Sequence, residues 1–234
     1  MYRDQRTNTD EFSYSSYKGY VDKVDGVGYA FDTFNVDGSS YGIEGAAITS
    51  DYYSTLAGIS LLKNPEEVDI NLLATPGIDT INNSKLVGQI FDIIEDRADT
   101  LYIVTTPDKE SGSGDFADEI PEVDETVSNF KDTELHSGYA ATYYPWVKIE
   151  DNGEYLYIPA TRDVVRNMAE SDNSNTTMNL SPAGLTRGKI KAIRARKNLK
   201  LDECDELYEA NINPVRTYAQ EGVIVMGQKT LRES

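Results

Sequence analysis

The sequence predicts an α/β fold in which helices flank a partly parallel sheet. Two short apolar runs, in residues 68–77 and 100–108, are separated by an amphipathic helical pattern in residues 84–99. Because strands that are joined through a helix run parallel to each other, this order favours a βαβ unit. At 234 residues, the chain is long enough for one substantial domain, or for one domain with a smaller partner.

Composition divides the chain into three segments. Residues 1–50 are rich in tyrosine and glycine, and we expect an irregular β or extended segment there. Residues 51–182 contain the α/β core, with an acidic insertion at residues 108–134, and residues 183–234 form a C-terminal α+β module, which the resemblance described below implies to be partial. We expect one short helix in the insertion, whose exposed surface is either a solvated loop or a contact surface.

The predicted core begins with a helix and continues with the βαβ unit. Residues 51–62 place apolar side chains at helical spacing, and Pro65 ends the run. Each of the two apolar strands leads into a loop that contains proline, and the helix between them carries Leu86, Ile90 and Ile94 on one face. We therefore expect this helix to pack on the sheet.

The second half of the core is predicted to be a hairpin followed by a helix. Residues 139–149 (YAATYYPWVKI) read as one buried strand, with its alternate aromatic side chains facing opposite layers and Pro145 at an edge or a bulge. A turn leads to a second strand at residues 155–160, and a helix follows at residues 161–171.

The C-terminal part is predicted to contain a long basic helix at residues 186–199, an acidic helix at residues 202–210 and a final strand at residues 222–231. Seven cations lie in or beside the basic helix: Arg187, Lys189, Lys191, Arg194, Arg196, Lys197 and Lys200.

These cations have three interpretations. They form a solvated face balanced by nearby acids, or a nucleic-acid site, or a contact for the acidic surface of a neighbouring copy. A nucleic-acid site needs aromatic side chains beside the cations, and none are interleaved in this stretch of sequence. Complementary patches on one protomer make a head-to-tail interface, which closes into a ring or continues as a helix.

Composition also limits the partners. A formal net charge of −18 repels nucleic acid and anionic membranes, so we expect no direct nucleic-acid binding. No apolar run approaches the ~18–20 residues that span a bilayer, so we expect no membrane insertion. The single cysteine, Cys204, excludes an internal disulfide and a multi-thiolate metal site, and its helical spacing to Leu207 predicts a small buried side chain.

Catalytic chemistry has little support in the sequence. The only histidine, His136, is adjacent to Ser137, and neighbouring residues on a strand point to opposite faces. No phosphate loop, calcium loop or nucleophile elbow has the required spacing. We therefore predict no catalytic, cofactor-binding or metal-binding residues. One enzymatic alternative remains, a carboxylate-dependent hydrolase with Asp79 and Asp108 at the carboxyl ends of the two strands, where open α/β sheets bind ligands.

Six segments of the chain form a recognisable series. They are EEVDINLLATPGI (66–78), SGYAATYYPWVKI (137–149), IPATRDVVRNMAESD (158–172), SPAGLTRGKI (181–190), LYEANINPVR (207–216) and GVIVMGQKTL (222–231). In this order, over roughly residues 38–234, they resemble the contractile tail sheath proteins of long-tailed bacteriophages. The motifs YYPW and SPAG…RG are the most specific of the series.

The resemblance implies a subtilisin-like sheath domain without protease activity and without a cofactor. It implies a structural subunit that forms stacked hexameric rings around a tail tube protein and contracts to drive the tube through the host envelope during genome delivery. Such a subunit is assembled in the host cytoplasm and belongs to the virion. In the family, the region that matches residues 183–234 lies in the inner layer of the sheath, so the seven cations are expected to contact other subunits or the tube. A non-phage contractile injection device is the alternative setting.

Two departures from the family pattern qualify these expectations. Family members usually have a tryptophan just before PAG, where this chain has Met178 and Leu180. They also carry an N-terminal arm and continue beyond GQKTLRES, so we expect a truncated fragment that is monomeric when isolated. In such a fragment, the final strand at residues 222–231 is expected to lack strand partners and to be poorly ordered.

Overall fold

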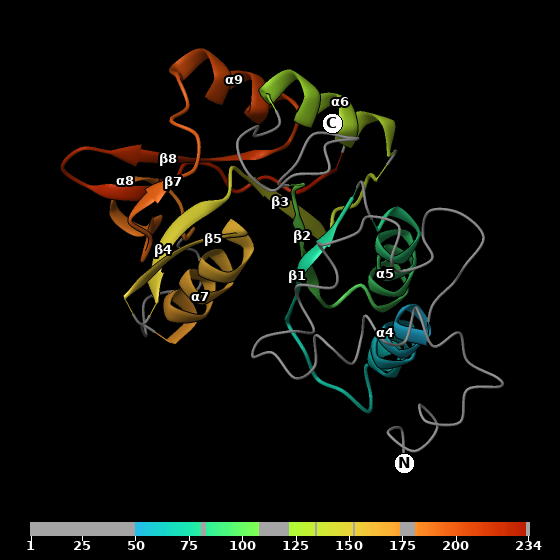
Figure 1. The fold of residues 1–234 in the computed structure, drawn as a ribbon. Coiled ribbons are helices and arrows are strands. Elements are labelled where there is room, and N and C mark those ends of the chain that lie inside the picture. Colours follow the sequence, from blue (N-terminus) through green and yellow to red (C-terminus); the bar gives the residue numbers. More distant parts are fainter. Residues whose placement is uncertain are drawn as a thin grey trace, which may run out of the picture.

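The computed structural model describes residues 50–80, 83–107, 122–133, 135–151, 153–173 and 181–232, without the side chains of residues 50–54 and 154. Within these ranges the chain has a mixed α/β fold built around a central sheet (Figure 1). Residues 1–49 of the predicted tyrosine- and glycine-rich segment, residues 108–121 of the acidic insertion, and the positions of Met178 and Leu180 lie outside the described residues.

The helices are α4 (Ser50–Ser60), the 3₁₀ turn η1 (Leu61–Lys63), α5 (Ser84–Arg97), α6 (Val123–Asp132), α7 (Ala160–Asn173), α8 (Gly184–Arg187) and α9 (Leu201–Glu209). The strands are β1 (Leu72–Asp79), β2 (Leu101–Thr105), β3 (Ala140–Tyr144), β4 (Val147–Asp151), β5 (Glu154–Ile158), β6 (Lys189–Ile190), β7 (Arg194–Ala195), β8 (Asn213–Tyr218) and β9 (Gly222–Val225).

In the described ranges, the larger sheet has six strands in the order β1-β2-β3-β8-β9-β6. Strands β1, β2, β3 and β8 run parallel, and β9 is antiparallel to both β8 and β6. The parallel pairing of β1 with β2 across α5 confirms the predicted βαβ unit. Strand β1 continues past Pro76 to Asp79, with a shift of register after Ala74, instead of ending at the proline as predicted.

The sheet is covered on both faces, and alternate residues of its central strands enter two separate cores. Tyr102 and Tyr144 join the cluster beneath α5, α6 and α9, whereas Ile103 and Tyr143 join the cluster beneath α7. This confirms that successive aromatic residues of β3 face opposite layers. Helix α5 also buries its predicted apolar face. Each fully buried large side chain contributes roughly 1.5–3 kcal/mol, so the two clusters hold the sheet and its helices together.

Residues 139–149 form two strands, which corrects the prediction of a single one. Strand β3 ends at Tyr144, the Tyr144–Pro145 peptide bond is cis, and β4 belongs to a second sheet with the order β5-β4-β7. Proline has no amide hydrogen with which to continue the ladder, so the chain leaves the first sheet there. In the connection, Trp146 Nε1 donates a hydrogen bond of 2.8 Å to the carbonyl oxygen of Thr106. The antiparallel pairing of β4 with β5 confirms the predicted hairpin.

The basic segment is not a helix, so the prediction for residues 186–199 is wrong. The segment contains the end of α8 and the short strands β6 and β7. Lys189 and Arg194 are exposed while Ile190 and Ala195 are buried. This alternation has the period of two that belongs to a half-buried strand, and it outweighs the helix propensity of lysine and arginine.

The final strand has partners on both sides, so the expectation that residues 222–231 lack them is also wrong. Strand β9 pairs with β8 and with β6. The chain after β9 is held as well, because the backbone amide of Leu231 donates to the carbonyl of Ala140 at 2.8 Å. The amide of Lys229 donates to Asn213 Oδ1 at 2.7 Å. These bonds fix the segment against β3 and β8.

Helices α7 and α9 lie where the sequence predicts them, and α6 lies in the predicted insertion. Cys204 is buried in α9, and burial raises the pKa of its thiol, as expected for a small buried side chain. None of the helices in the described ranges combines the length and the apolar character that crossing a bilayer requires. The same ranges hold no group of three or more histidine, cysteine, aspartate and glutamate side chains placed to bind a metal ion.

Candidate interaction surface

Because their segment is not a helix, the seven predicted cations lie in three different parts of the structure. Arg187, Lys189 and Lys191 are exposed at α8 and β6, beside α7. Lys191 Nζ lies 3.7 Å from Glu170 Oε1, which also accepts a hydrogen bond of 2.9 Å from Arg166 Nε. Arg166, and then Lys191, hold the pKa of Glu170 below its ordinary value. Lys191 is therefore a solvated cation balanced by an acid.

Lys197 and Lys200 lie at the start of α9. Lys197 Nζ is 2.5 Å from Glu122 Oε2 and 3.6 Å from Glu203 Oε1. The backbone amide of Lys200 donates to Glu203 Oε2 at 2.6 Å, which caps the first turn of α9. These contacts lie within the chain, so Lys197 stabilises the packing of the start of α9 against Glu122.

Arg194 begins β7 and Arg196 directly follows it, and both lie beside aromatic residues of β5. Arg194 Nη2 donates to Tyr157 Oη at 3.0 Å, and the guanidinium carbon of Arg196 lies 5.1 Å from the centre of the Tyr157 ring. Lys148 Nζ on β4 lies 4.3 Å from the centre of the Tyr155 ring and 5.8 Å from that of Tyr157. We refer to the surface formed by these residues (Lys148, Tyr155, Tyr157, Arg194 and Arg196) as the cation–tyrosine face.

Strand register brings this face together. Lys148 of β4 lies directly opposite Tyr157 of β5 on one side and Arg194 of β7 on the other. The intervening residues point inward, where Val147 packs in the core with Val164 of α7. The three-stranded sheet therefore has a mainly apolar inner face and an outer face of cations and tyrosine rings, which also carries the exposed Glu150 opposite Tyr155. Each cation–ring contact at an exposed site stabilises its pair by about 0.5–1 kcal/mol.

Sequence reasoning missed Lys148, Tyr155 and Tyr157. The signal was present in the hairpin, since residues 147–151 and 154–158 both alternate between apolar and polar or tyrosine side chains. Pairing that hairpin with the basic segment required the tertiary structure. Aromatic residues are absent from the basic segment of the sequence, but in the folded protein tyrosines of β5 lie beside its arginines.

A second charged surface lies on α9. Asp202, Asp205, Glu206 and Glu209 are exposed at spacings of three and four residues, so they form one stripe along the helix. We refer to these four residues as the acidic stripe. Among the described residues, none of them makes an ion pair. Reduced contact with solvent and the neighbouring carboxylate of Asp124 on α6 raise the pKa of Glu206.

Of the residues considered for catalysis, His136 and Ser137 line one pocket, which does not include Asp79. Asp79 is 4% exposed at the end of β1, and Asp108 lies outside the described residues. Ser137 Oγ donates to Glu95 Oε1 and accepts from the amide of Tyr139 at 3.0 Å.

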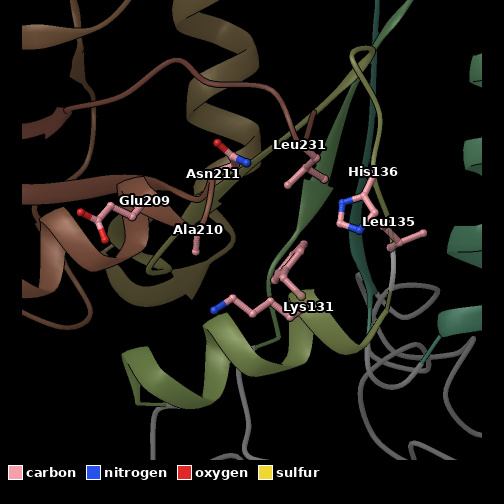
Figure 2. A pocket seen from close by; sticks show the side chains of 8 residues that line it. Lys131, Leu135, His136, Glu209, Ala210, Asn211 and Leu231 are labelled. Carbon is pink, nitrogen blue, oxygen red and sulfur yellow. The ribbon is translucent and has the colours of Figure 1, made fainter. Parts of the chain in front are cut away.

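Two pockets lie near His136. One, of about 300 Å³, has Glu209 and Lys131 toward one side and His136 and Leu135 toward the other (Figure 2). The other, of about 550 Å³, is lined by Glu95, His136, Ser137, Gly138, Tyr139 and Arg232. Neither pocket includes Asp79, so neither has the arrangement that the hydrolase alternative requires.

Comparison with known proteins relates this α/β fold to contractile sheaths. No model of a known protein family matches the sequence. The tail sheath protein of Vibrio phage KVP40 is 33% identical over 88 residues, which covers 37% of this chain and 13% of that protein. The tail sheath protein of Enterobacteria phage T4 is 31% identical over 115 residues, which covers 45% of this chain and 16% of that protein. The chain therefore matches a minor part of the length of these relatives.

Solved structures share the fold over most of the chain. A chain of the six-fold symmetrised baseplate of the anti-feeding prophage has a TM-score of 0.55 and 18% identity, covering 80% of this chain and 45% of that one. The contracted helical sheath of the same prophage has a TM-score of 0.51 and 17% identity, covering 75% and 43%. The contracted sheath complex of the extracellular contractile injection system PVC has a TM-score of 0.52 and 18% identity, covering 75% and 44%.

The fold is thus one found in contractile sheath structures. The chain itself is related in sequence to the tail sheath proteins of phages, so the resemblance read from its six segments is confirmed.

Proposed function

We propose that this chain is part of a structural subunit of a phage contractile tail sheath. The subunit polymerises around the tail tube and contracts to drive the tube through the host envelope during genome delivery. One observation carries the proposal: the chain is 31–33% identical to tail sheath proteins over 37–45% of its length and shares its fold with contracted sheaths over 75% of its length.

In this proposal, residues 51–182 form a subtilisin-like sheath core and residues 183–234 belong to the inner module of the subunit. Support for a doubly covered α/β core comes from the parallel strands β1, β2, β3 and β8 and from the hydrophobic clusters on both sheet faces. Strands β8, β9 and β6 of the second segment extend the sheet of the first, so the two segments move together.

Rigidity is the mechanical contribution of this fold. Subunits of a contracting assembly move as bodies, so the free-energy difference between its two states lies mainly in the interfaces between them. The buried aromatic residues of β3 tie the two cores to one sheet, which keeps a subunit intact while its contacts change.

The proposed partners are copies of the chain in stacked hexameric rings and the tail tube protein, in a particle assembled in the host cytoplasm and carried in the virion. The seven predicted cations remain the candidate contacts. Arg187, Lys189, Arg194 and Lys200 support this role best, because their side chains are exposed and make no ion pair with the described residues.

The role is structural and not enzymatic in this proposal. The tail sheath names of the relatives support it, and no observation at Asp79 favours the hydrolase alternative. The setting in a non-phage injection device is not favoured, since the sequence relatives are phage proteins.

Electron microscopy of the complete gene product that contains this chain tests the proposal. We expect the purified protein to form hollow tubes with a helical repeat, alone or with its tube protein. A product that stays monomeric across protein concentration, salt and addition of the tube protein would contradict it.

A further inference from the structure

We propose that the cation–tyrosine face binds the acidic stripe of a second copy of this chain. The inference deepens the proposed function, on which it rests, by naming the two surfaces that meet and the chemistry of the contact.

The cation–tyrosine face has the composition of a binding surface. Lys148 and Arg194 contact a tyrosine ring and a tyrosine hydroxyl, and neither makes an ion pair with the described residues. Tyr155 is 61% exposed. In a chain with 40 acidic residues, the charges of Lys148 and Arg194 are therefore available for a partner. Tyrosine and arginine are also the residues enriched where binding energy is concentrated.

The acidic stripe is the complementary surface. Its residues stand three and four positions apart with no cation between them on the same helix, so like charges face each other along α9. Reduced solvent contact and the carboxylate of Asp124 on α6, with a smaller contribution from Asp202 of the stripe, raise the pKa of Glu206, and Lys131 on α6 offsets part of this. A cationic partner relieves the repulsion, whereas another acidic surface increases it.

The spacings of the two surfaces agree. A rise of about 1.5 Å per residue places Asp202 and Glu209 about 10.5 Å apart, with neighbouring carboxylates of the stripe about 5–6 Å apart. Lys148 and Arg194 are paired across adjacent strands, which are separated by about 4.8 Å. Arg196 follows Arg194 by two residues, and its amide continues the pairing with the carbonyl of Trp146 at 2.8 Å, so extended spacing places the two about 6.6 Å apart. Successive carboxylates can therefore meet successive cations.

The contact is head to tail. The face is built from β4, β5 and β7 and the stripe from α9, and Figure 1 shows the β4–β5 hairpin and α9 as separate parts of the molecule. A copy that uses its face on one neighbour keeps its stripe for another, so the contact repeats along a ring or a helix.

Cross-linking of isotope-labelled copies tests the inference. Equal amounts of ¹⁴N- and ¹⁵N-labelled chain are treated with a carbodiimide at low ionic strength, and cross-linked peptides are analysed by mass spectrometry. We expect mixed-isotope links between Lys148 and residues of the acidic stripe. Links found only within one isotope, mixed-isotope links from Lys148 only to carboxylates outside the stripe, or no links would overturn the inference.

Two variants separate the surfaces. The face variant carries Tyr155→Ser and Arg194→Gln, and the stripe variant carries Asp202→Asn, Asp205→Asn and Glu206→Gln. Each alone is expected to lose these links at least about tenfold. In a mixture of the two, the links return only between Lys148 of the stripe variant and the stripe of the face variant. Return in the opposite direction, or no return, contradicts a head-to-tail contact.

Matched controls remove the same charge elsewhere. Lys63→Gln removes one exposed cation, and Glu66→Gln with Glu67→Gln and Asp69→Asn removes three exposed acids. Both controls are expected to cross-link like the original chain. Equal losses in the controls would mean that net charge, and not these two surfaces, governs the contact.

Single-stranded DNA provides the competing outcome, because tyrosines beside arginines also suit nucleic acid. We expect a fluorescent oligonucleotide not to bind at physiological salt. Binding that the face variant abolishes would assign the face to nucleic acid and overturn the inference.

The complete gene product distinguishes this inference from the proposed function. If the face and stripe variants form tubes as readily as the original sequence, the inference fails and the proposed function stands. If the original sequence forms no tubes, the proposed function fails, and the cross-linking result still decides whether the two surfaces meet.

Discussion

Arg97 and Asp99 form a two-pronged ion pair at the end of α5, with Arg97 Nε 2.9 Å from Asp99 Oδ1 and Nη2 3.0 Å from Oδ2. The Arg97 side chain is fully buried, and it also donates to the carbonyl oxygens of Leu62 and Val68. One guanidinium therefore ties the end of α5 to η1 and to the chain that leads into β1.

We predict that Arg97→Ala lowers the free energy of unfolding by about 3 kcal/mol, because it leaves buried carbonyl groups without donors. The exposed pair of Lys63 with Asp96, 3.6 Å apart, is the control, and Lys63→Ala is expected to cost under about 0.5 kcal/mol. Urea denaturation followed by circular dichroism measures both. Equal losses in the two variants would contradict the role of Arg97 as a clamp.

The burial of Asp163 is expected to make the stability of the protein depend on pH. The residue is 1% exposed, neither carboxylate oxygen has a hydrogen-bond partner among the described residues, and Arg162 Nε lies 3.9 Å from Oδ1. Burial raises the pKa of Asp163, and Arg162 and Arg166 offset only part of this. The folded state then holds a proton that the unfolded state releases, so stability falls as pH rises above the ordinary aspartate pKa of about 3.9.

We therefore expect Asp163→Asn to be more stable than the original chain at pH 7, with the difference closing as the pH approaches about 3.9. Asp99→Asn is the control of opposite sign, because the hydrogen bond from Arg97 lowers the pKa of Asp99. Its loss of stability is present at neutral pH and fades as pH falls through that lowered pKa. Denaturation across pH 3–7 checks both, and a pH-independent difference for Asp163→Asn would refute the assignment.

Replacing Trp146 in the aromatic stretch of residues 139–149 is expected to lower the stability of the protein. Its Nε1 donates to the carbonyl of Thr106 in the buried connection between the two sheets. We expect Trp146→Phe to lower the free energy of unfolding by about 1–3 kcal/mol, since the carbonyl loses its donor. Tyr139→Phe, at a position 39% exposed, is the control with little expected effect. A neutral Trp146→Phe would show that this bond does not hold the connection.

Adding a side chain at Gly188 is expected to cause a steric clash. A Cβ at Gly188 would lie 2.4 Å from the carbonyl oxygen of Val225, and the amide of Val225 donates to the carbonyl of Gly188 at 2.8 Å. Gly188→Ala is therefore expected to destabilise by about 1–3 kcal/mol. Gly58→Ala in α4, where a Cβ meets nothing within 4 Å, is expected to stabilise by about 0.5–1 kcal/mol. Thermal melting of both variants checks the opposite signs, and equal shifts would contradict the account.

The βαβ unit could be predicted from sequence because its signals are local. Leu86, Ile90 and Ile94 repeat at helical spacing, and the apolar runs on either side have no competing pattern. The break between β3 and β4 could not be predicted from sequence, because a proline such as Pro145 occurs equally at a strand edge, at a bulge and where the chain changes sheets. Only the pairing partners of the two strands decide among these.

The candidate site was predicted in part. Arg194 and Arg196 were identified, but a helix was inferred from lysine and arginine content, where Ile190 and Ala195 already alternate with cations. The part of Tyr157 in this surface could not be predicted from sequence, because its contact with Arg194 spans 37 positions and depends on the register of three strands. Long-range register is the information that a local pattern lacks.

Charge reversal in the complete gene product tests the central claim most directly, namely that this molecule acts by binding copies of itself through charged surfaces. Electron micrographs of Arg194→Glu with Arg196→Glu are compared with those of the original sequence and of Lys63→Glu, at low and at raised salt. The account predicts tubes for the original sequence and for Lys63→Glu, and no tubes, or tubes that dissolve at raised salt, for the double reversal. Tubes of equal number and salt resistance in all three would contradict it.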